Sequence, residues 1–222
     1  MTDRPIIFSG PMVRALLDGR KTQTRRLASS PLRRCQVGDR LYVREHWKVP
    51  TAYDDLAPSD LGGEEAVRYL ADGAIANLWG GDRTTLFGKH RQGMHMPRWA
   101  SRLMLIVEDV RFQRLQEISE ADAIAEGLFW QEPADEDRQW VIDRMEDGEG
   151  DGTIRGVWIV PGTDCGFGPK PRCPLWGPTP ASCYRGLWQS LHTADGERWE
   201  SNPEIVALTF RVIHQNIDRI AA

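Results

Sequence analysis

The stretch "PIIFSGPMVRALLDGRKTQTRR", residues 5–26, predicts a short strand, a turn and a helix that ends at a glycine. Pro11 suits the first position of a helix, and the apolar residues that follow it recur on one helical face. Gly19 stands where a left-handed C-terminal cap belongs. The helix is therefore expected to end at "GRKTQTRR", residues 19–26, which groups four cationic side chains around two threonines.

Further strands are expected where apolar and polar residues alternate with a period of two. The candidates are residues 40–44, 66–72, 102–115 and 204–213. In the third of them the apolar phase shifts near Glu108 and Asp109. Such a shift is typical of a bulge or bend, which is common where a sheet curls into a barrel.

The clearest helix signal is "ISEADAIAEGL", residues 118–128. Ser119 is a good N-cap with an acid three residues later at Asp122, and Gly127 closes the helix, so that Glu126 lies in its last turn. A second helical face recurs in "SCYRGLWQSLH", residues 182–192. Both patterns predict helices that pack one apolar face on the core.

Short strands interleaved with a few helices, without regular βαβ alternation, indicate an α+β fold with a small β-barrel and flanking helices. Between about residues 130 and 180 the composition shifts to acids, glycines and prolines without sustained periodicity. We read this segment as a long inserted loop. Residues 1–222 are expected to form a single domain that carries this insertion.

The net charge of −4 hides a strong asymmetry along the chain. Residues 1–50 hold eleven Lys and Arg against four Asp and Glu, whereas residues 117–151 hold two against thirteen. If the fold keeps the two regions apart, it presents a cationic face that attracts polyanions. The alternative is that the basic and acidic regions pair with each other.

No apolar run approaches the roughly 18 residues that a membrane helix needs, and the N-terminus carries no signal-peptide pattern. Four cysteines are few for a secreted disulfide scaffold. We therefore expect a cytoplasmic protein with reduced thiols and no membrane contact.

Several blocks together resemble the ASCH domain, a member of the PUA-like superfamily, in the larger form often encoded by phages and prophages. Besides residues 5–26, these blocks are "VGDRLYVREHW" (37–47), "HMPRWASR" (95–102), "LQEISEADAIAEG" (115–127) and "NPEIVALTFRVI" (202–213). The resemblance spans most of the chain outside the loop near 130–180. It implies a small β-barrel with flanking helices that recognises RNA or a modified nucleotide.

One branch of that family shares the "GRKT.T" block and comprises small bacterial amidohydrolases that deacetylate N4-acetylcytidine with a lysine, a threonine and a glutamate. The resemblance places these roles on Lys21, Thr24 and Glu126. Lys21 and Thr24 would face opposite sides of a regular strand, but they can converge across a helix end or turn. A desolvated neutral lysine could take the threonine proton, and a carboxylate could manage protons on the leaving nitrogen or on water.

A second interpretation is that the same cleft only binds its ligand, because arginines grip phosphates and aromatic rings stack on unpaired bases. Solvated charges and tryptophans that merely pack in the core are the plain alternatives. The candidate contacts to nucleic acid or substrate are Arg20, Arg25, Arg26, Tyr42, Arg44, Trp47, Arg98, Trp99 and Arg102. A ribonuclease of the same fold is a further alternative, but it needs a catalytic constellation that the sequence does not reveal.

A third constellation is formed by Cys165, Cys173 and Cys183. These thiols could hold a tetrahedral zinc if Cys35, His192 or another histidine completed the site. The spacing is not that of a CxxC knuckle, so ordinary loop thiols, no metal and no cofactor are the expectation. RNA or a nucleoside is the expected partner, and the oligomeric state is left open.

Overall fold

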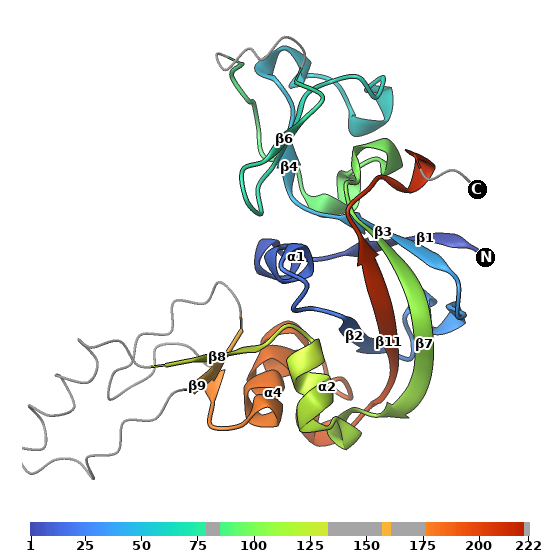
Figure 1. Ribbon diagram of the computed structural model, residues 1–222, viewed down its shortest axis with the longest axis vertical. Coiled ribbons are helices and arrows are strands. Elements are labelled where there is room, and N and C mark those ends of the chain that lie inside the picture. Colours follow the sequence, from blue (N-terminus) through green and yellow to red (C-terminus); the bar gives the residue numbers. More distant parts are fainter. Residues whose placement is uncertain (79–84, 133–156, 161–175, 220–222) are drawn as a thin grey trace, which may run out of the picture. The chain divides into compact units, whose positions relative to one another are not determined.

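The computed structural model of the chain describes residues 1–78, 85–132, 157–160 and 176–219, and these form a mixed α+β structure (Figure 1). The strands are β1 (Asp3–Ile7), β2 (Gln23–Leu27), β3 (Arg40–Arg44), β4 (Trp47–Lys48), β5 (Val67–Tyr69), β6 (Ile75–Ala76), β7 (Met104–Arg114), β8 (Phe129–Gln131), β9 (Val157–Ile159), β10 (Trp176–Gly177) and β11 (Glu204–Ile213). The α-helices are α1 (Gly10–Leu17), α2 (Glu120–Ala125) and α4 (Pro180–Leu191).

Short 3₁₀ turns connect many of these elements. They lie at Pro31–Arg34, Thr51–Tyr53, Pro58–Asp60, Gly93–His95, Arg98–Ala100, Leu115–Glu117, Trp199–Ser201 and Ile217–Arg219. In the part of the chain with described coordinates, none of the helices has both the length and the apolar composition of a membrane span.

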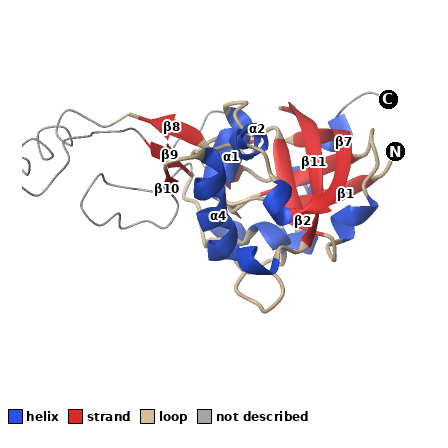
Figure 2. Ribbon diagram, turned by 90° about the horizontal axis from the view of Figure 1, so that it is seen from below, coloured by secondary structure: helices blue, strands red, loops and turns tan. Residues whose placement is uncertain are grey.

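The largest sheet has five strands in the order β1-β3-β7-β11-β2 (Figure 2). β1 runs parallel to β3, and β3 runs antiparallel to β7. Two three-stranded sheets have the orders β4-β5-β6 and β10-β9-β8. The α+β class is therefore confirmed, and within the described residues the sheets do not close into a barrel.

The chain divides into two compact units, each built from segments that are distant in sequence. Unit 1 comprises Met1–Thr22, Arg34–Arg111 and Leu208–Ala222, and unit 2 comprises Gln23–Arg33 and Phe112–Ala207. The expected single domain with its insertion stays a prediction. Residues 133–156 and 161–175 of that insertion lie outside the described residues.

One hydrophobic cluster of unit 1 surrounds Trp47, which is fully buried. Trp47 comes from β4 and packs with Val67 and Tyr69 of β5 and with Met96. Tyr42, Met104 and Ile217 form a second cluster. The β4-β5-β6 sheet is thus tied to the segment before β7 by large apolar side chains rather than by further strands.

Unit 2 is organised by α2 and α4, which lie side by side (Figure 1). Ser119 caps α2 and forms a capping box with Asp122, and Thr179 caps α4 in the same way. Gly127 follows α2 with φ of +101°, a conformation that costs other residues free energy. The cap and glycine signals in the sequence therefore located α2 correctly.

The other local predictions also hold. α1 begins beside Pro11 and is followed by Gly19 with φ of +71°. β11 has the boundaries predicted from the sequence, and β7 is a single curved strand in Figure 1. On β7 the neighbours Glu108 and Asp109 are both exposed, which breaks the alternation of a regular strand at the point where the apolar phase shifts.

Candidate active site

The first half of β2 is enclosed on both faces of the strand. Gln23, Thr24 and Arg25 are consecutive, so their side chains alternate between the faces, yet each is at most 4% exposed. A strand buried on both faces normally carries apolar residues. This one carries an amide, a hydroxyl and a guanidinium, which must all find polar neighbours.

Arg25 finds those neighbours on α2. Its guanidinium lies 3.2 Å from the Glu126 carboxylate and 3.0 Å from the Asp122 carboxylate, and it also donates to the Gln23 side chain. The Tyr184 ring of α4 lies beneath it at 5.9 Å. Asp122 and Glu126 are four residues apart, so they project from the same face of the helix end. The result is a buried cation held by two carboxylates.

Thr24 accepts a hydrogen bond from the charged side chain of Arg26, two residues further along β2. Arg26 Nη1 donates to Thr24 Oγ1 at 2.7 Å and also to the Arg25 carbonyl at 2.8 Å. Burial lowers the pKa of Arg26, while the charge of Glu126 acts in the opposite direction. Because the guanidinium occupies a lone pair of the hydroxyl oxygen, the hydroxyl proton remains available for donation.

Tyr184 adds a phenol to the same cluster. Burial raises the pKa of Tyr184 well above 10, and the negative charge of Glu126 and a hydrogen bond to Glu126 raise it further. The phenol therefore stays protonated and donates to the carboxylate at neutral pH. Glu126, itself 3% exposed, is held by Arg25 and Tyr184 from two different elements.

Lys21 belongs to unit 1, where it directly precedes the boundary between the units at Thr22. It is 2% exposed, its main-chain N–H donates to Ala15, and its Nζ lies 5.5 Å from the centre of the Phe8 ring. Thr24 is three positions further along the chain, so the two Cα atoms lie within about 11 Å of each other. Its convergence with Thr24 and Glu126 stays a prediction.

The remaining candidate contacts from the first part of the chain have differing environments. Arg20 is half-buried and pairs with Asp18. Tyr42 is largely buried, with the Arg44 and Arg98 guanidinium groups 5.3 and 5.7 Å from its ring centre. Arg44 also donates to the Tyr42 hydroxyl. Tyr42, Arg44 and Arg98 together form a cationic, aromatic surface. The role of these residues and of Arg20 in nucleic-acid binding stays a prediction.

Arg98 and Arg102 both carry ion pairs. Arg98 contacts Asp3 and Asp218, and the hydrogen bonds to Asp218 and Asp3 raise its pKa. Arg102 donates to both oxygens of Glu45 and to Asp72. Burial raises the pKa of Glu45, while its two hydrogen bonds from Arg102 lower it. Both arginines are therefore engaged by protein carboxylates in this structure.

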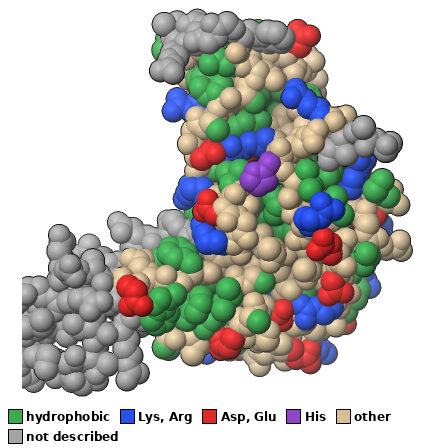
Figure 3. Space-filling model, viewed as in Figure 1, with side chains coloured by type: hydrophobic (Ala, Val, Ile, Leu, Met, Phe, Trp, Pro, Cys, Tyr) green, Lys and Arg blue, Asp and Glu red, His purple; other side chains and the backbone are tan. Residues whose placement is uncertain are grey.

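The two predicted aromatic walls differ in exposure. Trp47 is fully buried in the first cluster, whereas Trp99 is half-buried at the edge of that cluster. Trp99 lines a pocket, which is described below. On the face shown in Figure 3, basic and acidic side chains are interspersed.

Of the predicted zinc ligands, Cys165 and Cys173 lie outside the described residues. Cys183 on α4 is a buried free thiol, as is Cys35. Burial raises the pKa of Cys35. Across residues 1–78, 85–132, 157–160 and 176–219, no three His, Cys, Asp or Glu side chains are grouped to hold a metal ion.

The sequence did not identify Gln23, Asp122 and Tyr184 as parts of the polar cluster around Arg25. Asp122 was expected only as a capping acid and Tyr184 only as part of an apolar helix face. The available signal was a run of polar residues at the start of a strand without apolar alternation.

The chain matches no family model, no curated protein and no solved structure with significance.

Proposed function

We propose that this chain is an ASCH-type protein of the PUA-like superfamily that hydrolyses the exocyclic amide of an N-acylated cytidine. The observation that carries the proposal is the guanidinium that donates to the Thr24 hydroxyl, in the same unit as the buried Glu126 carboxylate. A phosphate-gripping surface needs exposed cations, whereas Arg25 is buried and ion-paired. The amidohydrolase branch of the resemblance supplies the substrate class.

In the proposed reaction the Thr24 oxygen attacks the acyl carbonyl carbon while the neutral Lys21 amine takes the hydroxyl proton. Removal of a lysine from water in general disfavours its ammonium form, and Lys21 is 2% exposed. The tetrahedral intermediate collapses with cleavage of the C–N bond, and the leaving nitrogen gains a proton. Water then attacks the threonine ester, releasing the carboxylic acid and restoring the hydroxyl.

Arg26 and Glu126 have distinct roles in this scheme. Arg26 donates to the Thr24 oxygen, so its charge favours the alkoxide that forms during attack. Glu126 directs protons to the leaving nitrogen and from the hydrolytic water. Arg25 and Tyr184 hold the Glu126 carboxylate in place and are positioning residues.

A non-catalytic nucleic-acid module is the second candidate. The observation that favours it is the full burial of Thr24, since an acyl carbonyl reaches this hydroxyl only after covering side chains move. In this account the cationic, aromatic surface of Tyr42, Arg44 and Arg98 holds the ligand and Thr24 only stabilises β2.

The experiment is chromatographic detection of acyl loss from a panel of N4-acylated cytidines, with wild type and with Lys21→Ala and Glu126→Gln. Each substitution is expected to reduce turnover by about 10²–10⁴-fold, as for positioned proton-transfer groups. A soluble primary amine should partly restore Lys21→Ala but not Glu126→Gln. No wild-type turnover on the whole panel, or full activity in both variants, would refute the enzymatic proposal.

A further inference from the structure

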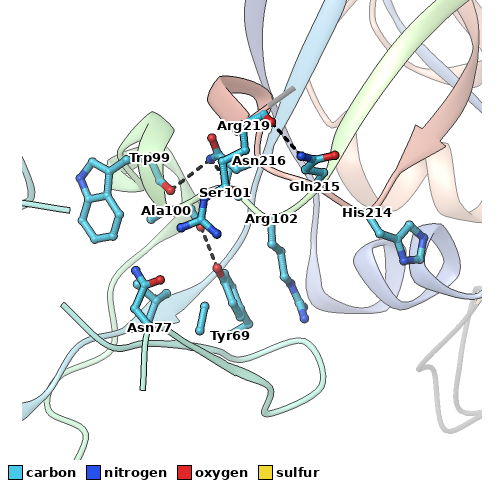
Figure 4. A pocket seen from close by; sticks show the side chains of 12 residues that line it. Tyr69, Asn77, Trp99, Ala100, Ser101, Arg102, His214, Gln215, Asn216 and Arg219 are labelled. Atoms are coloured by element: carbon cyan, nitrogen blue, oxygen red, sulfur yellow. Dashed lines mark hydrogen bonds between the residues drawn. The ribbon is translucent and has the colours of Figure 1, made fainter. Parts of the chain in front are cut away.

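A pocket in unit 1, apart from the proposed catalytic residues, is lined by β5, by the turn before β7 and by the segment after β11 (Figure 4). Its volume is about 210 Å³. In Figure 4, Trp99 and Asn77 lie on one side of the pocket and His214 lies on the opposite side. The volume is below the roughly 300–1,000 Å³ of sites for drug-sized ligands, so it suits a single small ring system.

The aromatic wall of the pocket is held rigidly. Gly63 lies beside the Trp99 indole, since a Cβ added there would be in ordinary contact with the ring at 3.6 Å. The Asn216 amide donates to the carbonyls of Arg98, Trp99 and Ser101, which fixes the turn that carries the indole. A preorganised indole is a suitable platform for stacking a planar base.

Several polar groups in the pocket are already satisfied by the protein. Tyr69 donates its hydroxyl proton to the Ala100 carbonyl, and burial raises the pKa of Tyr69 to about 12. Arg102 is engaged by Glu45 and Asp72. Tyr69 and Arg102 therefore shape the pocket, and other side chains must provide the polar contacts to a ligand.

Two amide oxygens at the wall remain available as acceptors. Asn77 donates its amide nitrogen to the Gly63 and Glu65 carbonyls, and Gln215 donates its own to the Arg219 carbonyl. In neither case does another described residue donate to the amide oxygen. Such oxygens match the exocyclic amino group of a nucleobase.

Arg219 supplies an available cation at the edge of the pocket. It is exposed, and within the described ranges its guanidinium has neither an ion pair nor a hydrogen-bond acceptor. Arg219 is one of the residues that line the pocket. Its charge acts to lower the pKa of Tyr69, although the larger effect of burial raises that pKa. A free guanidinium beside an aromatic wall matches a phosphate attached to a stacked base.

We infer that this pocket binds one nucleotide, with the base stacked on Trp99 and the phosphate paired with Arg219. The base bears an exocyclic amino group that donates to Asn77 or Gln215. The nucleotide is either free or part of a single-stranded RNA, and these sources share the same chemistry. The site does not require the proposed hydrolase activity, because none of its lining residues belongs to the catalytic set.

Calorimetric titration of the full chain with cytidine 5′-monophosphate tests this inference. We expect 1:1 binding, with cytidine and ribose 5-phosphate each at least about tenfold weaker. Arg219→Ala should weaken the nucleotide by about tenfold and leave cytidine unchanged, whereas Arg211→Ala should change neither. Arg211 is an exposed arginine on β11 that pairs with Glu108 and does not line the pocket.

Two further variants test the other parts of the inference. Trp99→Leu removes the stacking contact, and Lys21→Ala shows whether the proposed catalytic residues contribute to nucleotide binding. Trp99→Leu, checked for folding by circular dichroism, should weaken both cytidine and its monophosphate, and Lys21→Ala should bind the monophosphate as wild type does. Tighter binding of a cytidine hexanucleotide supports RNA as the source, and equal binding supports the free nucleotide. Absence of saturable binding up to about 1 mM, or equal losses in Arg219→Ala and Arg211→Ala, would overturn the inference.

Discussion

The Arg25 guanidinium lies 3.2 Å from the Glu126 carboxylate, although 101 residues separate them in the sequence. The pair joins β2 to the end of α2 and has almost no exposure to solvent. Removing one partner of such a pair leaves an uncompensated charge in the interior, which costs more than the pair contributes when both are present. The proposed catalytic carboxylate is thus also a structural group of unit 2.

Glu126→Leu should therefore lower the free energy of unfolding by about 3 kcal/mol, at the low end of the range for buried pairs because Asp122 still contacts Arg25. The double substitution Arg25→Leu with Glu126→Leu should recover part of this loss. Urea denaturation of the wild type, of Arg25→Leu and Glu126→Leu as single variants, and of the double variant measures the coupling. The exposed pair of Arg211 and Glu108, at a similar distance of 3.3 Å, is the control, and Glu108→Leu should change stability by about 1 kcal/mol or less. Equal losses at the two sites would contradict this prediction.

Gly19→Ala should destabilise the protein by about 1 kcal/mol, because Gly19 has φ of +71° and alanine adopts this conformation poorly. No atom lies within 4 Å of the site where a Cβ would be added, so the cost is one of backbone conformation alone. Gly62→Ala is the matched control, since its backbone is not in the left-handed region and its added Cβ meets only Glu65 at ordinary contact distance. A shift in thermal midpoint for Gly19→Ala no larger than that for Gly62→Ala would argue against the cap.

His192 should make stability depend on pH. Burial lowers the pKa of His192, although Glu197 partly opposes this, and the ring stacks on Trp188 with centroids 4.0 Å apart. Since the unfolded pKa of histidine is about 6.5, the unfolded state binds more protons in this region. The contribution of His192 to the free energy of unfolding should be fully present above about pH 6.5 and should be lost as the pH drops below this value. His192→Gln should reduce this slope between about pH 7.5 and 5. An identical slope in urea titrations of both proteins would count against the shift.

Single-stranded RNA should bind the cationic N-terminal region with an affinity that falls steeply between about 50 and 200 mM salt. Arg44→Ala should weaken binding and reduce the dependence on salt by about one counterion, because Arg44 is a half-buried cation beside the Tyr42 ring. Arg185→Ala is a suitable control, as Arg185 is an exposed arginine on α4. Fluorescence anisotropy with a labelled oligonucleotide gives both values. Salt-independent binding would refute the prediction.

The sequence predicted the elements that depend on local signals. Gly19, Ser119 and Gly127 mark helix ends by cap chemistry, and the alternation in residues 204–213 gave β11 its boundaries. It also identified Lys21, Thr24 and Glu126 as polar residues worth attention, although their roles came from the family resemblance. All three are buried, which the local sequence does not specify.

Contacts between distant segments could not be predicted in the same way. No spacing rule pairs Arg25 with Glu126, since the pairing arises from the packing of β2 against α2. The proposed nucleotide pocket depends on Asn77, which adopts φ of +55° after β6, and on Arg219 in a 3₁₀ turn after β11. These positions are set by tertiary packing, which the local propensities of a sequence do not specify.

The comparison of Thr24→Val with Thr22→Val in hydrolysis of an N4-acylated cytidine tests the central claim most directly. Thr22 is exposed and two residues away in the same motif, so it controls for the chemical change. The account predicts that Thr24→Val loses at least about 10²-fold in kcat while its affinity for the substrate stays close to that of wild type, and that Thr22→Val retains turnover. Full turnover by a folded Thr24→Val protein would contradict the account.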